Sequence, residues 1–115
     1  MITLYGIPNC DTVKKARACL DAAGLAYEFV DFKKSPPDIA RVTRWCKQLG
    51  AGIVLNRRGT TWRQLDAATQ AHASTEAGAI ALLVANPSAI KRPVIESGAT
   101  LLIGFDAAQY AKLLK

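Results

Sequence analysis

The fold is decided by residues 6–15, which read Gly6-Ile7-Pro8-Asn9-Cys10-Asp11-Thr12-Val13-Lys14-Lys15. The run before them, Met1-Ile2-Thr3-Leu4-Tyr5, is largely apolar and prone to β structure, which predicts a buried strand. After Cys10, apolar residues recur at helical spacing until Gly24 supplies a stop. Because Gly-x-Pro-Asn is typical of a turn, we expect Cys10 where a strand turns into the first turn of a helix.

A cysteine at this position is a candidate nucleophile. Unpaired backbone N–H groups and the positive end of the helix dipole both favour a thiolate over a thiol. Lys14 lies one turn further on and can add a positive charge, or it can simply be solvated. Asp11 and Thr12 are ordinary first-turn residues that also flank the thiol. The competing interpretation of Cys10 is a small packing residue.

Composition limits the class of protein. With 115 residues, half of them apolar, we expect one domain with its own core. No apolar run approaches the ~18 residues of a membrane span, and no signal peptide is evident, so we expect a cytoplasmic protein. Three scattered cysteines and one histidine predict neither a disulfide framework nor a metal site. We therefore interpret Cys19 and Cys46 as packing residues.

The charge pattern favours small anionic substrates or acidic proteins over nucleic acid. The net charge is +6, but the basic residues are dispersed along the chain. Few aromatic residues accompany them, and no basic and aromatic repeat suggests a surface for stacking bases. We expect no nucleic-acid or membrane partner.

The rest of the chain reads as a second strand, a helical middle and a β-β-α ending. A strand over 25–32 completes a β-α-β unit and predicts a parallel strand pair. Ser35 is a plausible N-cap for a helix that ends at Gly50, with the two following prolines in its first turn. Short helices are expected from Thr60 or Thr61 and over 67–73, and a buried helix from Ser74 or Thr75 to residue 85.

The ending is a hairpin and a capped helix. Val94-Ile95-Glu96 and Thr100-Leu101-Leu102-Ile103 flank a tight turn, Ser97-Gly98-Ala99. Asp106 then caps a final helix, with Leu113 and Leu114 on its apolar side.

This order is that of the thioredoxin-like fold, and four strings resemble the arsenate-reductase-like (ArsC) family, which includes the Spx-type transcription regulators. The strings span most of the chain: Ile2 to Ala16, Leu55-Asn56-Arg57-Arg58-Gly59-Thr60-Thr61-Trp62, Ile90-Lys91-Arg92-Pro93-Val94 and Ile103-Gly104-Phe105-Asp106. The chain looks most like the small bacterial members of this family. The resemblance implies an α/β protein with a four-stranded mixed sheet. Its core would cover about 1–35 and 88–115, with a helical insertion over about 36–87.

The resemblance also assigns the site. Cys10 would be the nucleophile, and Pro93 would be the cis-proline that faces it. Arg92 matches an arginine that binds the oxyanion and stabilises the thiolate, a task that suits its fork of donors. Asn9, Asp11, Thr12 and Lys14, next to Cys10, are further candidates for substrate binding.

The chain departs from the family pattern in two ways. The glutaredoxin-coupled arsenate reductases use three arginines around the cysteine, whereas Asn56 and Phe105 occupy two of those positions here. Arg58 is a candidate to supply the missing charge from a shifted loop. An Spx-type redox switch needs a second cysteine where this chain has Val13.

We therefore expect a thiol oxidoreductase with a single reactive cysteine, which attacks an oxyanion such as arsenate or the sulfur of a mixed disulfide. Glutathione or another small thiol, with glutaredoxin behind it, would be the external reductant. We expect a monomer without a bound cofactor or metal. The alternative is a regulator without enzymatic activity that docks on RNA polymerase or another protein.

Overall fold

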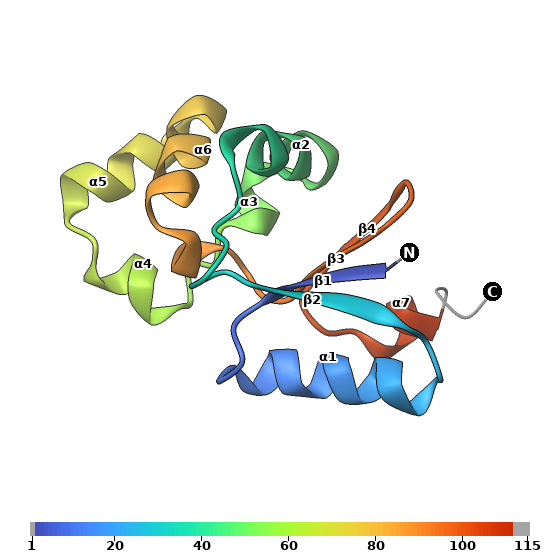
Figure 1. The fold of residues 1–115 in the computed structure, drawn as a ribbon. Coiled ribbons are helices and arrows are strands. Elements are labelled where there is room, and N and C mark those ends of the chain that lie inside the picture. The colour runs from blue at the N-terminus through green and yellow to red at the C-terminus, as the bar shows by residue number, and fades with distance from the viewer. Residues whose placement is uncertain (1, 112–115) are drawn as a thin grey trace. The chain divides into compact units, whose positions relative to one another are not determined.

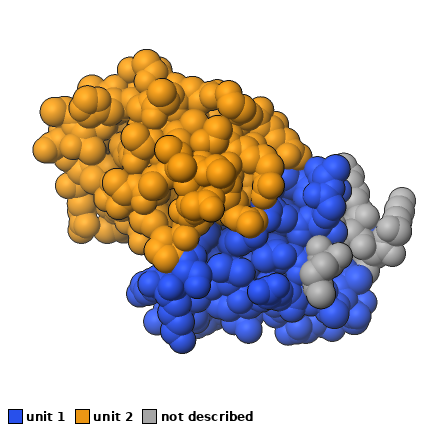
Figure 2. Space-filling view, turned by 45° about the horizontal axis from the view of Figure 1, so that its top comes forward, with its two compact units in different colours: residues 1–35, 92–115 blue, residues 36–91 orange. Residues whose placement is uncertain are grey.

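The computed structural model describes residues 2–111, which form two compact units shown in separate colours in Figure 2. Unit 1 combines Met1–Ser35 with Arg92–Lys115, and unit 2 is Pro36–Lys91. Residues 88–91, which were expected in the thioredoxin-like core, therefore group with the helical unit. The expected positions of Leu113 and Leu114 lie outside the described residues.

Unit 1 is a mixed sheet with helices on one face. Its elements are β1 (Ile2–Gly6), α1 (Asp11–Ala22), β2 (Tyr27–Asp31), β3 (Val94–Ser97), β4 (Thr100–Ile103) and α7 (Ala107–Ala111). The strand order is β2-β1-β3-β4. The β1 and β2 strands are parallel, whereas β1 with β3 and β3 with β4 are antiparallel. The expected four-stranded mixed sheet is confirmed.

The core of unit 1 lies between the sheet and its two helices. Both α1 and α7 cover the same face of the sheet (Figure 1). Because side chains alternate along a strand, Ile2 and Leu4 of β1 point to this face. They join a buried cluster from the sheet and both helices: Val13, Ala16, Leu20, Ile95 and Tyr110.

Tyr5 belongs to the opposite face of β1, where it is also buried. Its ring stacks on Phe32 with centroids 6.2 Å apart. Its hydroxyl donates a hydrogen bond of 2.6 Å to Oε1 of Glu96 on β3. Tyr5 thereby ties the first strand to the third.

Unit 2 is helical. Its elements are α2 (Ile39–Leu49), α3 (Ala51–Val54), α4 (Thr60–Gln64), α5 (Ala67–Ala71), η1 (His72–Ser74), α6 (Glu76–Ala85) and η2 (Pro87–Ala89). The α2, α3 and α6 helices pack on one another. They bury a set of apolar side chains: Val42, Trp45, Cys46, Val54, Ala79, Ile80, Leu82 and Leu83.

Most of the expected helix boundaries are confirmed. Gly50 ends α2 with a φ of 98°, a left-handed conformation that glycine adopts without strain. Thr75 is the N-cap of α6, and its hydroxyl accepts a hydrogen bond from the Gly78 N–H. Asp106 accepts hydrogen bonds from the first turn of α7.

The expected N-cap at Ser35 is wrong. The α2 helix begins at Ile39, and its N-cap is Asp38, whose Oδ1 accepts a hydrogen bond of 2.9 Å from the Arg41 N–H. Ser35 precedes Pro36, which in turn precedes Pro37, and a residue before proline is disfavoured in the α region. The helix therefore starts after both prolines.

No helix among residues 2–111 combines the length and the apolar character needed to cross a membrane.

The corrected N-cap gives a stability prediction. Asp38→Ala should lower the free energy of unfolding by about 1 kcal/mol, because it removes the side-chain acceptor at the start of α2. Ser35→Ala is the matched control and should leave stability within about 0.5 kcal/mol of the parent. Urea denaturation followed by circular dichroism measures both. Equal losses in the two variants would contradict the assignment of Asp38.

Candidate active site

Cys10 is the N-cap of α1, where β1 has turned towards the helix. Its backbone is extended, with φ of −99° and ψ of 123°, and its carbonyl accepts the Lys14 N–H at 2.9 Å. Cys10 is half-buried. The neutral thiol makes no capping hydrogen bond. The N–H groups of the first turn are thus available to a thiolate, which accepts hydrogen bonds far better than a thiol.

Arg92, which begins the second chain segment of unit 1, acts on Cys10 although the two residues are far apart in the sequence. It precedes β3, and the Arg92–Pro93 peptide bond is cis, as the resemblance implies. Pro93 is buried, and its carbonyl accepts the Gly104 N–H at 2.8 Å. The Nε atom of Arg92 is buried, and its side chain interacts with the Cys10 sulfur by charge and by hydrogen bonding.

The surroundings of Cys10 lower the pKa of its thiol. Partial burial is the largest single influence and raises the pKa, because it removes water from the thiolate. The Val13 N–H, the Arg92 side chain and the Thr12 N–H act in the opposite direction and together prevail. Because the pKa is lower in the folded chain, ionised Cys10 stabilises the fold at alkaline pH, and this contribution disappears as the pH falls through the folded-state pKa.

Gly6 allows α1 to start close to β1. Gly6 is buried at the end of β1, where it pairs with Asp31 and its carbonyl accepts the Phe32 N–H at 2.8 Å. A Cβ added at Gly6 would lie 2.7 Å from Cγ2 and 3.3 Å from Cγ1 of Val13. Val13 is fully buried and branched at Cβ, so it has little freedom to move aside. The absence of a side chain at Gly6 therefore lets Val13, whose N–H acts on Cys10, take its place.

The other predicted site residues separate into two groups. Thr12 is half-buried, and its backbone N–H acts on Cys10. Asn9, Asp11 and Lys14 are exposed. The positive charge that acts on Cys10 is that of Arg92. Arg58 belongs to unit 2, and its backbone N–H donates to Oδ1 of Asn56.

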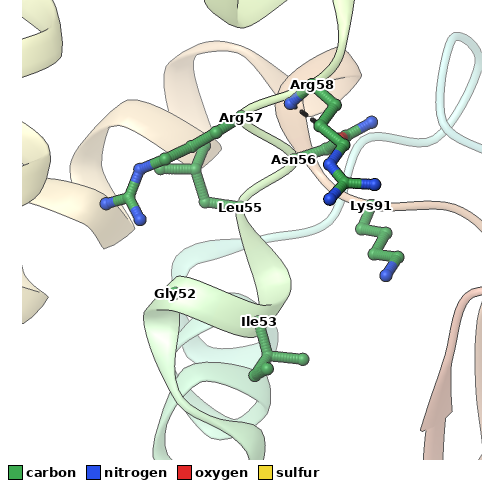
Figure 3. Close-up of a pocket in the computed structure, with 7 residues that line it drawn as sticks. All are labelled: Gly52, Ile53, Leu55, Asn56, Arg57, Arg58 and Lys91. Carbon is green, nitrogen blue, oxygen red and sulfur yellow. Dashed lines mark hydrogen bonds between the residues drawn. The ribbon is translucent and has the colours of Figure 1, made fainter.

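Sequence reasoning missed two residues. It treated Gly6 only as a turn residue, and it assigned nothing to Lys91, which lines a pocket in unit 2 with Arg58 (Figure 3). No short sequence pattern signals the role of Lys91, because the pairing of two segments that are far apart in the sequence brings it to this pocket. Among residues 2–111, no group of three or more histidine, cysteine or carboxylate side chains could hold a metal ion.

The remaining thiols have packing roles. Cys19 is half-buried against the core of unit 1, and Cys46 is buried in α2. Burial raises the pKa of the Cys46 thiol, and the nearby Glu76 carboxylate adds to this effect. Cys10 is the thiol whose surroundings favour ionisation.

Comparisons with known proteins agree on one family. The family model described as the ArsC family matches residues 5–113. An uncharacterised protein of Haemophilus influenzae is 38% identical over 96% of each chain. The solved structure of the YFFB protein is 48% identical over the whole of both chains, with a TM-score of 0.95. That of an arsenate reductase (ArsC) related protein from Brucella melitensis is 42% identical over 99% of this chain and 94% of its own, with a TM-score of 0.76.

Arg92 should control the reactivity of Cys10. Arg92→Ala should raise the pKa of Cys10, because it removes a positive charge and a hydrogen-bond donor. Alkylation at pH 7 should become slower in proportion to the lost thiolate fraction, and the rates of parent and variant should converge above both pKa values. Arg92→Lys should fall between them, since it keeps the charge but not the fork of donors.

Lys14→Ala is the matched control and should leave the alkylation profile unchanged. The measurement is the pH dependence of iodoacetamide modification at Cys10, followed by mass spectrometry. A change in the Lys14→Ala profile as large as that in Arg92→Ala would contradict the assignment.

The contact between Gly6 and Val13 predicts a rescue. Gly6→Ala should destabilise the fold by about 1–3 kcal/mol through overpacking and should raise the pKa of Cys10 by displacing the first turn of α1. Val13→Ala alone should cost stability by leaving a cavity, but should keep the pKa of Cys10 low. The double variant should recover the low pKa, because it removes both clashing methyl groups. A pKa that stays high in the double variant would refute this role of Gly6.

Proposed function

Since the chain belongs to the ArsC family, we propose that it is a glutathione-dependent thiol oxidoreductase that reduces mixed disulfides through Cys10. The observation that carries the proposal is the position of Cys10 at the N-cap of α1, where Arg92 and two backbone N–H groups of the first turn act on its sulfur and lower the pKa of the thiol. The thiolate is the species that attacks a disulfide sulfur, and a lowered pKa increases the thiolate fraction at neutral pH.

The reaction consists of two exchanges. In the first, the Cys10 thiolate attacks the glutathione sulfur of a mixed disulfide, a Cys10–glutathione disulfide forms, and the substrate thiol leaves as a thiolate that takes a proton from water. In the second, the thiolate of a free glutathione attacks the glutathione sulfur of this intermediate. The products are oxidised glutathione and the Cys10 thiolate. The net reaction converts the mixed disulfide and one free glutathione into the substrate thiol and oxidised glutathione, and the protein is unchanged.

Arg92 and the α1 N–H groups act in both exchanges. They stabilise the Cys10 thiolate as it attacks, and again when it leaves in the second exchange. The same positive charge can bind a carboxylate of glutathione. Position 13, where a second cysteine would resolve the intermediate, is a buried valine. Turnover with an external thiol is consistent with this arrangement.

Disulfide reduction suits the site better than arsenate reduction. Arsenate carries more negative charge than a disulfide, and the family pattern meets it with three arginines. Here Phe105 occupies one of those positions, and its ring packs edge-on against Tyr110 with centroids 5.1 Å apart. Asn56 occupies another, and its side-chain Oδ1 accepts a hydrogen bond from the Arg58 N–H. We place the reaction in the reducing cytoplasm, a location supported by three free thiols.

The proposal predicts turnover of a mixed disulfide of glutathione and 2-mercaptoethanol. The parent protein with excess glutathione should release oxidised glutathione above the background rate, and Cys10→Ser should reduce release to background. Cys19→Ala is the matched control and should retain turnover. Formation of oxidised glutathione is followed by coupling to glutathione reductase and NADPH.

Mass spectrometry of the protein without free glutathione should find one glutathione, bound at Cys10. Arsenate in place of the disulfide should give no arsenite. Turnover that survives Cys10→Ser, or the absence of any adduct, would overturn the proposal. Capture of RNA polymerase that is insensitive to Cys10→Ser would then favour the regulator.

A further inference from the structure

We infer that β4, an edge strand of unit 1, pairs with the same strand of a second copy of this chain. The protein would then form a reversible two-fold dimer in place of the monomer expected from the sequence. This inference does not depend on the thiol chemistry proposed above. β4 forms a hairpin with β3 (Figure 1) and is the last strand in the order β2-β1-β3-β4. Its outer side therefore has no neighbouring strand among the described residues.

The pairing with β3 identifies the backbone groups on the outer side of β4. The Gly104 N–H donates to the Pro93 carbonyl at 2.8 Å, so Gly104 directs its backbone groups towards β3. Because these groups alternate in direction along a strand, those of Leu101 and Ile103 point away from β3. Within residues 2–111, these two residues have no hydrogen bond to a loop or a side chain. Their N–H and carbonyl groups form an unpaired edge that can accept another strand.

The two edges of the sheet differ in charge. β2, at the other edge, contains Glu28 and Asp31 and is followed by Lys33 and Lys34. The Asp31 carbonyl also accepts the N–H groups of Lys34 and Ser35, so the chain turns away at this point. Charged side chains and a short usable edge hinder the addition of another strand. β4 has the sequence Thr-Leu-Leu-Ile, without a charged residue or a proline, so it lacks this protection.

The sequence of β4 is complementary to itself in the antiparallel direction. With a two-fold axis at Leu102, Leu101 of each copy lies opposite Ile103 of the partner subunit. Both residues direct their backbone groups outwards, so each such pair exchanges both of its N–H···O=C hydrogen bonds. Because β4 carries no charge, this register places no like charges opposite one another. A second copy therefore satisfies the edge in full.

The side chains along this edge also favour an apolar partner. Leu102 packs against the core of unit 1, whereas Leu101 and Ile103 are half-buried and, by alternation, point to the opposite face of the sheet. Phe105 follows the strand and is 36% exposed. Pairing would remove apolar surface from water on both faces of the edge, in addition to forming the hydrogen bonds. Because the strand is short, we expect the dimer to be weak and reversible.

Self-association is measured on the full chain by sedimentation velocity from about 10 μM to about 1 mM, the range in which weak complexes form. A reducing agent is present so that no disulfide can link two chains. The parent should shift reversibly from monomer to dimer. Leu101→Pro should weaken the dimer at least about tenfold, because proline removes the outward N–H of this residue in both copies. The monomer should remain folded, since this N–H does not pair with β3.

A pair of charge variants tests the register. Leu101→Lys and Ile103→Glu should each weaken the dimer about tenfold, because each places a charge in the apolar contact. An equimolar mixture of the two should recover pairing, since the new lysine then lies opposite the new glutamate. Ala18→Lys is the matched control, because it adds the same charge at an exposed position of α1. It should keep the affinity within about twofold of the parent.

Circular dichroism establishes that each variant is folded, and the charge pair decides the question if Leu101→Pro is not. A parent protein that stays monomeric at about 1 mM would overturn the inference and leave the edge to an extended segment of another protein. Equal weakening by Leu101→Lys and Ala18→Lys would show general charge repulsion instead. A mixture that does not recover pairing would exclude this register. Association that persists in Cys10→Ser supports a contact separate from the reactive thiol, and its loss there would contradict one.

Discussion

The close approach of α1 to the end of β1 is the constraint on which the candidate active site depends. Gly6 has no side chain, so Val13 packs directly against the strand and the first turn of α1 is fixed beside Cys10. The pairing of Gly6 with Asp31 holds the strand from its other edge. Burial of Val13 therefore serves the core and the site together, since its side chain anchors the helix while its N–H acts on the sulfur.

The electrostatic balance at Cys10 follows from this geometry. A thiolate in a partly buried place loses hydration, and three donors compensate for the loss. Two of them are backbone N–H groups of α1. Because the helix already holds them in place, little conformational entropy is lost when they bind the thiolate. The third, Arg92, comes from the segment that enters β3. The site thus combines backbone N–H groups, supplied locally by the strand-turn-helix stretch, with one side chain from a distant part of the sequence.

Residue types predicted the local features well and the long-range ones poorly. The turn before Cys10, the parallel β1–β2 pair and the hairpin at Gly98 follow from patterns within short windows, and the resemblance supplied the cis bond before Pro93. The N-cap at Ser35 failed because two consecutive prolines shift the start of α2. The pocket in unit 2 could not be read from the sequence, because a single bridge between Leu55 and Ile90 creates it. Nor does any window reveal that Gly6 is needed for space, since its backbone does not adopt a positive φ.

The interleaved order of the two units bears on how the protein is made. Unit 1 draws its neighbouring central strands, β1 and β3, from the two ends of the chain, while unit 2 is one continuous segment between them. During synthesis, β1, α1 and β2 leave the ribosome long before Arg92 and β3 do. The nascent chain therefore carries Cys10 without the guanidinium that helps to lower the pKa of its thiol. The contribution of Arg92 waits until translation reaches the last fifth of the chain, which begins at this residue.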